Sequence, residues 1–484
     1  MLPKNNLIIK LTDRLFNVLN EKSGIESIHI VIQIAYLLLL KRENPNLWKQ
    51  IKQQGHSPAI DEIREQIVHI QQQTADSYNL PCYIIQDFEF KINRIEIVSE
   101  CVDIINSIYK ETENLGSSLN GTITYYDIDS AIFDDLYEKI MKKPEKFQNL
   151  YIPRHIRYLM ASLTQINYSD RIYDPMCGNG GLLLSVYERI MIKEYESQNQ
   201  DVIDTDNDGF STLRYSLMAN LPSPDTLNGS DPNPQQLLLS ALSFQLRGIK
   251  KANLQPNNFI QNNISEHFDV IIANPPFGQK FNKPHQINEV VIKNAEIVFI
   301  DKIADTLSPT GRATIIVSEG FLSNTNSQHM QCRKKIFTQY RLEGVISLPS
   351  GIFLNTQAKS SILILSKDEH NNRPDVWFYE LQNDGYTNDR AKRRTKEFPL
   401  PEVVKAFRER QYNSQNKRTE TCFFVSFEEI QRNDYNLSYS RYKQFNYERQ
   451  DHGDVCEMMQ EIIHNERDIQ NILNELESTF IWKK

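Results

Sequence analysis

The turn Asn274-Pro275-Pro276-Phe277 carries the residue types with the clearest chemistry in this sequence. It follows a short apolar run, Phe268 to Ala273, that predicts a buried strand. Proline fixes φ and has no N–H, and the residue before a proline is pushed towards extended geometry. We therefore expect a stiff turn that presents oxygen acceptors beside an aromatic ring. Such an arrangement suits an amino group on a flat ring.

A second candidate site is a glycine turn between a predicted strand and a predicted helix in residues 171–184. Its glycines are Gly178, Gly180 and Gly181. They permit positive φ and close approach of a ligand to the free N–H groups of the helix. The turn lacks the G-x-G-x-x-G pattern of dinucleotide folds and the G-K-[ST] ending of a P-loop. Instead Asp174 and Pro175 precede it, and a carboxylate there suits the cationic amino-acid end of a ligand such as S-adenosylmethionine. Glycine turns after strands are common, so this motif favours a methyltransferase without establishing one.

A further acidic residue, Asp231, ends another predicted strand ahead of a helix over residues 237–246, where it is suited to hold ribose hydroxyls. Residues 204–209 imitate the start of an EF-hand loop, but Tyr215 stands where that loop needs glutamate, so we expect no calcium. The six cysteines form no C-x-x-C pair, which argues against zinc and against a disulfide framework. No metal site is predicted.

Predicted strands and helices alternate along the middle of the chain. After the turn at 274–277 come a helix, a strand, a helix and two strands, over residues 296–307, 312–318, 328–340, 342–349 and 361–366. This order is typical of an α/β fold with a doubly wound, mostly parallel sheet, and the last two strands predict an antiparallel edge hairpin. Ligands of such sheets bind beyond the carboxyl ends of the strands.

The length of 484 residues favours two or three domains. Apolar residues at 3–4 spacing predict a helical N-terminal domain at 1–128, followed by the sheet domain at 129–370. We expect a C-terminal extension at 371–450 and a final helix at 451–484. Pro153 suits the first turn of a helix near the start of the sheet domain.

Composition bounds the location and the partners. A hydrophobic content of 40% with 24% charged residues is that of a globular protein. The longest apolar stretch, residues 25–40, is too short and too polar to span a bilayer, and the N-terminus lacks the order of a signal peptide. A cytoplasmic protein without a membrane partner is therefore expected. The net charge of −8 means that contact with DNA would need a local basic face or a partner.

Two features near the C-terminus can serve binding. A basic cluster comprises Arg390, Lys392, Arg393, Arg394 and Lys396, and it is either a solvated surface or a DNA contact. Further on, residues 454–480 carry a heptad-like apolar stripe, formed by Val455, Met459, Ile462, Ile469, Leu473, Leu476 and Phe480. That helix packs either on its own domain or on a partner.

Several stretches together resemble one family, the modification (M) subunits of type I restriction-modification systems, which are adenine-N6 DNA methyltransferases. In the order of that family's motifs they begin at Ile152-Pro153-Arg154, Asp174-Pro175, Gly229-Ser230-Asp231, Asn274-Pro275 and Leu348-Pro349. The segments at 377–381, 426–430 and 434–442 are also similar to it, so the resemblance covers residues 129–445. Two departures stand out. The family's Gly-x-x-x-Thr-Pro lead-in is altered before Pro153, and Gln261-Asn262 replaces its Gly-Asp.

The resemblance implies roles for individual residues. Asn274 and Pro275 would accept the two N–H bonds of a flipped adenine's amino group, with Pro276 stiffening the turn and Phe277 stacking on the base. S-adenosylmethionine would be held by Asp231, by the glycine turn with Asp174 and Pro175, and by three residues taken from the family pattern: Pro153, Arg154 and Asn262.

The implied partners are DNA, a specificity (S) subunit contacted through residues 454–484, and a restriction (nuclease) subunit. Two other readings stay open. One is a methyltransferase acting on RNA or on a protein glutamine, and the other is a catalytically inactive assembly subunit of a DNA-binding complex.

Overall fold

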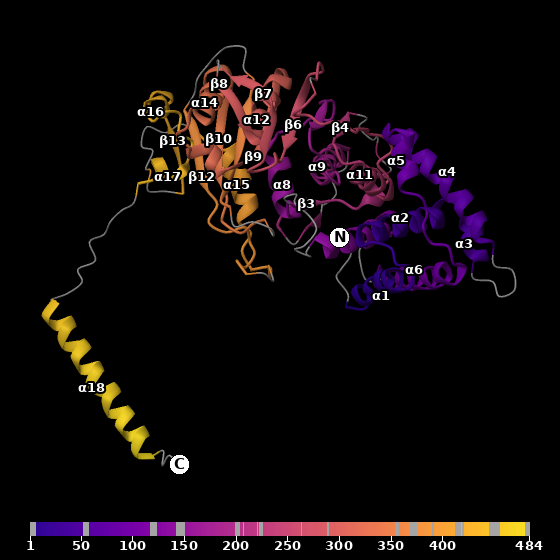
Figure 1. Ribbon diagram of the computed structural model, residues 1–484, viewed down its shortest axis with the longest axis horizontal. Coiled ribbons are helices and arrows are strands. Elements are labelled where there is room, and N and C mark those ends of the chain that lie inside the picture. Colours follow the sequence, from indigo (N-terminus) through magenta and orange to yellow (C-terminus); the bar gives the residue numbers. More distant parts are fainter. Residues whose placement is uncertain are drawn as a thin grey trace. The chain divides into compact units, whose positions relative to one another are not determined.

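The computed structural model describes most of the chain (Figure 1). The described residues are 6–51, 58–116, 123–141, 151–198, 204–206, 208–219, 221, 226–262, 264–287, 290–353, 358–367, 375–389, 392–411, 418, 421–444 and 455–479. The chain forms two compact units, residues 1–442 and 443–484. Arg390 of the basic cluster and Phe480 of the apolar stripe lie outside the described residues.

The first unit is built on a mixed sheet. Across the sheet the order is β13-β12-β10-β11-β9-β6-β1-β4-β5. The strands are β1 (Ile172–Asp174), β4 (Leu227–Ser230), β5 (Asn253–Gln255), β6 (Phe268–Ala273), β9 (Leu307–Ser318), β10 (Arg341–Ser347), β11 (Ser360–Ser366), β12 (Val376–Glu380) and β13 (Cys422–Val425). Two small hairpins stand outside this sheet, β2 (Asp204–Thr205) with β3 (Ser211–Thr212), and β7 (Lys280–Ile287) with β8 (Val290–Asn294).

The pairing confirms a mostly parallel core with an antiparallel hairpin. Strands β5, β4, β1, β6 and β9 pair in parallel, while β11 runs antiparallel to both β9 and β10. The expected position of that hairpin at the sheet edge is corrected by the strand order. Beyond β10 the sheet continues with β12, parallel to β10, and with β13, antiparallel to β12. Both added strands come from the region predicted as a C-terminal extension, so part of that region completes the sheet.

Helices precede and alternate with the strands. Those of the N-terminal part are α1 (Asn6–Lys22), α2 (Ser27–Glu43), α3 (Pro45–Gln50), α4 (Ile60–Tyr78), α5 (Cys82–Asp87), α6 (Ile95–Gly116) and α7 (Tyr125–Met141). The others in the first unit are α8 (Arg154–Leu163), α9 (Gly181–Gln198), α10 (Tyr215–Met218), α11 (Pro234–Leu246), α12 (Ala295–Thr306), α13 (Glu319–Ser323), α14 (Ser327–Gln339), α15 (Pro399–Arg408), α16 (Phe427–Arg432) and α17 (Tyr439–Tyr442). The second unit contains α18 (Val455–Thr479).

Each face of the sheet has its own apolar core because side chains alternate along a strand. In β6, Val270 and Ile272 join a core shared with α8, α9, α11 and the N-terminal helices. Ile271 and Ala273 point to the opposite core, which contains α12 and α14. Helices α2, α4 and α5 of the N-terminal part pack on α11 (Figure 1). Because both faces of the sheet are covered by helices, the positions that remain open to a ligand lie at the ends of the strands.

Among the described residues, no single helix is both long and apolar enough to cross a membrane. Only a pair of helices, at residues 7–22 and 27–43, is together long and apolar enough to do so, and the two helices are bent by 117° relative to each other. Twelve of the 17 residues of α2 are buried within the protein.

A buried carboxyl stands in the N-terminal half, at Asp129. Asp129 lies inside α7, which begins at Tyr125, and its side chain is 0% exposed. It accepts a hydrogen bond from the hydroxyl of Tyr109. Burial raises the pKa of Asp129 to about 7, against the opposing effects of the Tyr109 bond and of Arg42 and Lys41.

This carboxyl is expected to make stability depend on pH. Because its pKa is raised in the folded state, its contribution is fully present below pH 3.8 and is lost as the pH rises through 7. The shift corresponds to about 4 kcal/mol at most. Asp129→Asn, which cannot ionise, should therefore gain stability over the wild type as the pH increases from 4 to 8. Urea unfolding at several pH values measures this difference, and parallel curves for the two proteins would contradict it.

Candidate active site

The two turns singled out in the sequence flank the point where the strand order reverses. From β1 the chain adds β4 and β5 on one side, and β6 and β9 on the other. Ile172 and Tyr173 of β1 pair in parallel with Val270 and Ile271 of β6. The glycine turn after β1 and the proline turn after β6 therefore emerge at the same edge, at a topological switch point, where open α/β sheets bind ligands.

The glycine turn is held open by contacts to the neighbouring strand end and helix. Gly178, at φ +55°, donates its N–H to Asp231 at 3.1 Å, and its carbonyl accepts from Ser240 Oγ at 2.7 Å. At Gly180, φ is +78° and a Cβ atom would lie 2.8 Å from the ring of Phe244. A side chain is therefore excluded by both backbone strain and packing against α11, which keeps the turn tight.

Two buried carboxyls stand beside this turn. Asp174 is 1% exposed and accepts the Met176 N–H at 3.1 Å, while the carbonyl of the next residue, Pro175, accepts from Ser230 Oγ at 3.1 Å. Burial raises the pKa of Asp174 to about 8, and the charge of Asp231 adds to the effect. Burial also raises the pKa of Asp231. Carboxyls that are costly to ionise in the absence of a cation are suited to a cationic ligand.

The proline turn leaves β6 with its residues partly covered. Pro275 is buried, and Asn274, Pro276 and Phe277 are half-buried. The ring of Phe277 lies edge-on to Phe353, with 6.4 Å between ring centroids and 88° between planes. Phe353 belongs to the segment that follows β10, so the turn contacts the next part of the sheet edge.

A cavity of about 250 Å³ opens along that part of the edge. One wall is the segment after β10, including Leu348 and Ile352, and the other is formed by residues 380–388 and Lys392. Strand register explains the position, because Ser347 of β10 pairs with Glu380 of β12. The cavity and the proline turn are thus joined through Ile352 and Phe353.

Two residues predicted to hold a cofactor stand at the start of α8. Pro153 is the residue that precedes this helix, and Arg154 is its first residue. The guanidinium of Arg154 lies 3.7 Å from both Glu188 and Asp206, and it donates to the hydroxyl of Tyr158 at 3.0 Å. The contacts of Arg154 described here are therefore with protein groups, and its role with a cofactor stays a prediction.

Asn262 lies in the loop after β5, with its side chain exposed. Lys302 of α12 donates to its carbonyl at 2.7 Å and to the carbonyls of Phe259 and Ile260 at 3.0 and 3.1 Å. One lysine thus fixes this loop at the edge of the sheet. The predicted contact between Asn262 and a cofactor stays a prediction.

Two residues near the glycine turn and the cavity escaped the sequence reasoning. Arg157 on α8 lies against Gly181, the first residue of α9, in the space that a Cβ would need. His155 on the same helix pairs with Asp384 of the cavity wall. The sequence predicted a helix beginning near Pro153, which contains both residues. Their partners, Gly181 and Asp384, are distant in sequence, so these contacts could not be predicted.

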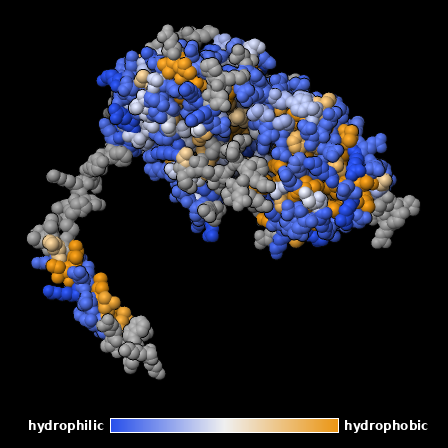
Figure 2. Space-filling model, viewed as in Figure 1, coloured by the Kyte–Doolittle hydropathy of each residue, from blue (hydrophilic) through white to orange (hydrophobic). Residues whose placement is uncertain are grey.

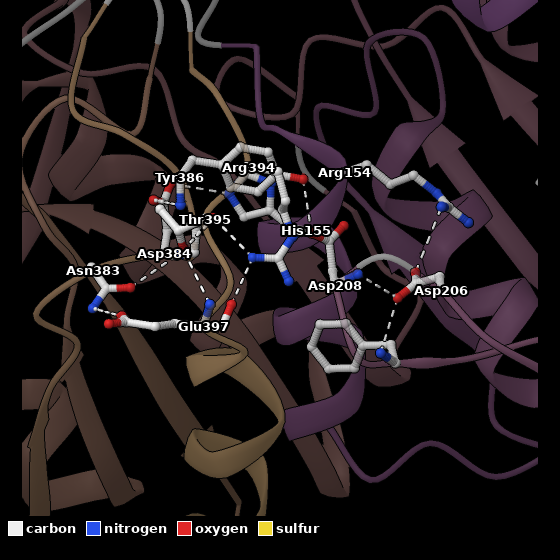
Figure 3. Close-up of polar contacts among 12 residues, drawn as sticks. Arg154, His155, Asp206, Asp208, Asn383, Asp384, Tyr386, Arg394, Thr395 and Glu397 are labelled. Carbon is white, nitrogen blue, oxygen red and sulfur yellow. Dashed lines mark hydrogen bonds and ion pairs between the residues drawn. The ribbon is translucent and has the colours of Figure 1, made fainter. Parts of the chain in front are cut away.

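The acidic hairpin that imitated a calcium loop binds protein groups instead. Asp206 accepts the N–H groups of Asp208 and Phe210, both at 2.9 Å, which closes the turn between β2 and β3. Asp208 accepts from the hydroxyl of Tyr386 at 2.7 Å and lies 3.3 Å from Nε of Arg394 (Figure 3). One member of the basic cluster is therefore a structural contact. Over the described residues, no group of three or more His, Cys, Asp or Glu side chains is arranged to hold a metal.

The sheet order, with these two turns at its switch point, defines a methyltransferase fold. Within that class the chain belongs to the N-6 DNA methylase family, whose model matches residues 128–451. The resemblance to modification subunits of type I restriction-modification systems is thereby confirmed.

Individual relatives agree with this assignment. The EcoEI type I methylase subunit of Escherichia coli is 25% identical over 260 residues, which cover 51% of this chain and 49% of that protein. The match thus spans about half the length of that relative. Among solved structures, the type I methyltransferase subunit of Streptococcus thermophilus superposes with a TM-score of 0.59 at 17% identity, covering 90% of this chain and 99% of the other. A chain from a study of complex assembly in the type I system gives a TM-score of 0.63 at 18% identity, with 99% of both chains covered.

Proposed function

We propose that this protein transfers a methyl group from S-adenosylmethionine to the N6 amino group of a flipped adenine in DNA, as the modification subunit of a type I-like restriction-modification complex. The observation that carries the proposal is the juxtaposition at the switch point. A glycine turn with two buried carboxyls and an Asn-Pro-Pro-Phe turn leave neighbouring strands at the same sheet edge. Membership of the N-6 DNA methylase family supports the choice of substrate.

The residues present fit the cofactor. Positive φ at Gly178 and Gly180 turns the chain tightly into α9, and the first N–H groups of a helix are available to a ligand. Asp174 would face the cationic amino-acid end of S-adenosylmethionine, and Asp231 would lie towards the ribose. When bound, S-adenosylmethionine supplies an electrophilic methyl group attached to a sulfonium.

The proline turn would position the acceptor. Methyl transfer from a sulfonium is an in-line displacement, so the protein mainly aligns the nucleophile and places acceptors where positive charge develops. The side-chain oxygen of Asn274 and the carbonyl of Pro275 would accept the two N–H bonds of the adenine amino group, which directs its lone pair towards the methyl group. Phe277 would stack on the base, contributing about 1–3 kcal/mol. This offsets part of the few kcal/mol that base flipping costs.

The proposal is tested by incubating the protein, with the subunits encoded beside it, with tritiated S-adenosylmethionine and unmethylated DNA. Nucleoside analysis should then find the label in N6-methyladenine. Label in RNA or in protein glutamine, with none in DNA, would replace the proposed substrate. No saturable cofactor binding would leave an assembly subunit as the function.

The specificity subunit is proposed to bind α18. The described side chains of this helix, residues 459–476, are all exposed, and its apolar residues form a stripe along it (Figure 2). They are 47–63% exposed: Met459, Ile462, Ile463, Ile469, Ile472, Leu473 and Leu476. Apolar residues at this spacing are typical of helices that pack on another helix. The net charge of −8 favours a separate subunit for contact with the target DNA.

Ile469→Lys is expected to weaken association with the specificity subunit by about tenfold or more, because burial of an Ile side chain contributes about 1.5–3 kcal/mol. Gln470→Lys is the matched control, since it adds the same charge to an adjacent residue outside the stripe. Analytical ultracentrifugation of the purified pair measures the change. Equal weakening by both variants would indicate a charge effect and would contradict the proposed contact.

A further inference from the structure

One short helix, α8, contacts both the start of α9 beside the glycine turn and the wall of the cavity. Arg157 of α8 lies against Gly181 at the start of α9, next to the glycine turn. Two residues earlier, His155 contacts residues 384 and 386 of the cavity wall, as Figure 3 shows. The two sets of contacts come from a single helical turn, so a displacement of α8 at one would be transmitted to the other.

The contact through His155 is buried and specific. Its Nε2 lies 3.1 Å from Oδ2 of Asp384, and the two side chains are 9% and 6% exposed. Although burial opposes it, the hydrogen bond and the charge of His155 hold the pKa of Asp384 below its usual value. The imidazole also stacks on the ring of Tyr386, with 4.5 Å between centroids and 25° between planes. Both contacts fix His155 in one orientation against the wall.

Asp384 carries this contact into the backbone of the wall. Its second oxygen, Oδ1, accepts the N–H of Tyr386 at 3.2 Å. Asn383 closes the same turn by accepting the N–H of Gly385 at 3.1 Å, and Gly385 has φ +85°. The side chain of Asp384 thus bridges His155 and the turn at residues 383–386, and three residues of that turn line the cavity.

A second anchor lies on the far side of Tyr386. Its hydroxyl donates to Asp208 at 2.7 Å, and Arg394 bonds the carbonyls of Gly385 and Glu397 at 2.8 and 2.6 Å (Figure 3). The wall is therefore fixed on one side to the β2–β3 hairpin and on the other to α8. The hairpin itself reaches α8 through the ion pair of Asp206 with Arg154, at 3.7 Å, whereas His155 joins the wall to α8 directly.

We propose that His155 is a positioning residue that couples occupancy of the cofactor site to the wall of the cavity through Asp384. The inference rests on the proposed function, since it takes the glycine turn as the cofactor site, and it adds that the cavity beside the proline turn receives part of the DNA. In this arrangement, a ligand that orders the glycine turn and α8 also orders the turn at residues 383–386 before DNA enters.

Hydrogen exchange on the full-length protein, with and without S-adenosylhomocysteine, measures the coupling directly. In the wild type, this reaction product should slow exchange at residues 176–182 and, by about fivefold or more, at the amides of Gly385 and Tyr386. His155→Leu should retain the protection at 176–182 and lose it at residues 385 and 386. His155→Gln, which keeps a donor near the position of Nε2, should restore part of it.

The control is a second histidine–aspartate pair of the same kind. His285 lies 2.9 Å from Asp301, and His285→Leu should leave the protection of both segments unchanged. Protection of residues 385 and 386 in His155→Leu equal to the wild type overturns the inference, as does its failure to appear in the wild type when 176–182 is protected. Absence of any protection at 176–182 in the wild type would instead contradict the proposed cofactor site. His155→Phe, which keeps a ring against Tyr386 but has no donor for Asp384, supplies the comparison if His155→Leu does not fold.

Discussion

The Asn274→Ala variant is expected to lose methyl transfer to DNA by about 10²–10³-fold in kcat, the loss typical when one preorganised polar group is removed from a developing charge. Its Kd for S-adenosylmethionine should stay unchanged, because Asn274 belongs to the turn after β6 and the glycine turn follows β1. The acceptor would act only as the amino group gains positive charge, so the loss falls on kcat. Incorporation of tritiated methyl groups into DNA measures it.

Two further substitutions separate chemistry from stability. Asn274→Asp keeps an oxygen acceptor at the same position and should retain more activity than Asn274→Ala. Asn326→Ala is the matched control, because Asn326 caps α14 by accepting the His329 N–H at 3.0 Å. Loss of that cap should cost about 1 kcal/mol of stability. Methyl transfer by the control should continue, and full activity in Asn274→Ala would end the catalytic assignment.

The sheet edge that carries Asn274 was readable from sequence for a physical reason. Parallel strands share the direction of their carboxyl ends, so two turns that each follow a buried strand must meet at one edge. Helix ends could also be predicted, because the residues that cap a helix are its neighbours in sequence. The predicted helix at 328–340 corresponds to α14, which is capped by Asn326. The apolar run from Phe268 to Ala273 corresponds to β6 over the same residues.

Contacts between distant segments were not readable. Strands β12 and β13 extend the sheet beyond β10, in a region that the sequence indicated as a C-terminal extension. His155 and Asp384 are 229 residues apart, and the pair follows from the path of the whole chain. The acidic residues at 204–209 were expected to bind no calcium, but the groups that Asp208 contacts instead, Tyr386 and Arg394, lie far along the chain. In each case the partner was set by tertiary packing.

Asp174 should make cofactor binding depend on pH. In the free protein its pKa is about 8, so at pH 6 the carboxyl is almost entirely protonated. A cationic ligand beside it favours the carboxylate, so binding below pH 8 releases a proton, and affinity rises with pH, by up to tenfold per unit. The α-ammonium of the ligand itself titrates near 7.7–8.0, so titrations between pH 6.0 and 7.0, where it stays largely protonated, report mainly on the protein group. Calorimetry in two buffers that differ in ionisation enthalpy counts the released proton.

Asp174→Asn removes the titrating group and the charge together. Its affinity for S-adenosylmethionine should fall by about tenfold or more at pH 7.5, because a hydrogen bond to a charged group contributes about 1.5–3 kcal/mol. The proton release should disappear. Asp170→Asn is the matched control, since Asp170 precedes β1, at the opposite end from Asp174, and pairs with Arg312. Because Asp170 is remote from the glycine turn, Asp170→Asn should keep the wild-type dependence of affinity on pH. If the affinity of the wild type did not change with pH, Asp174 would already be ionised before the cofactor binds, and the prediction would be contradicted.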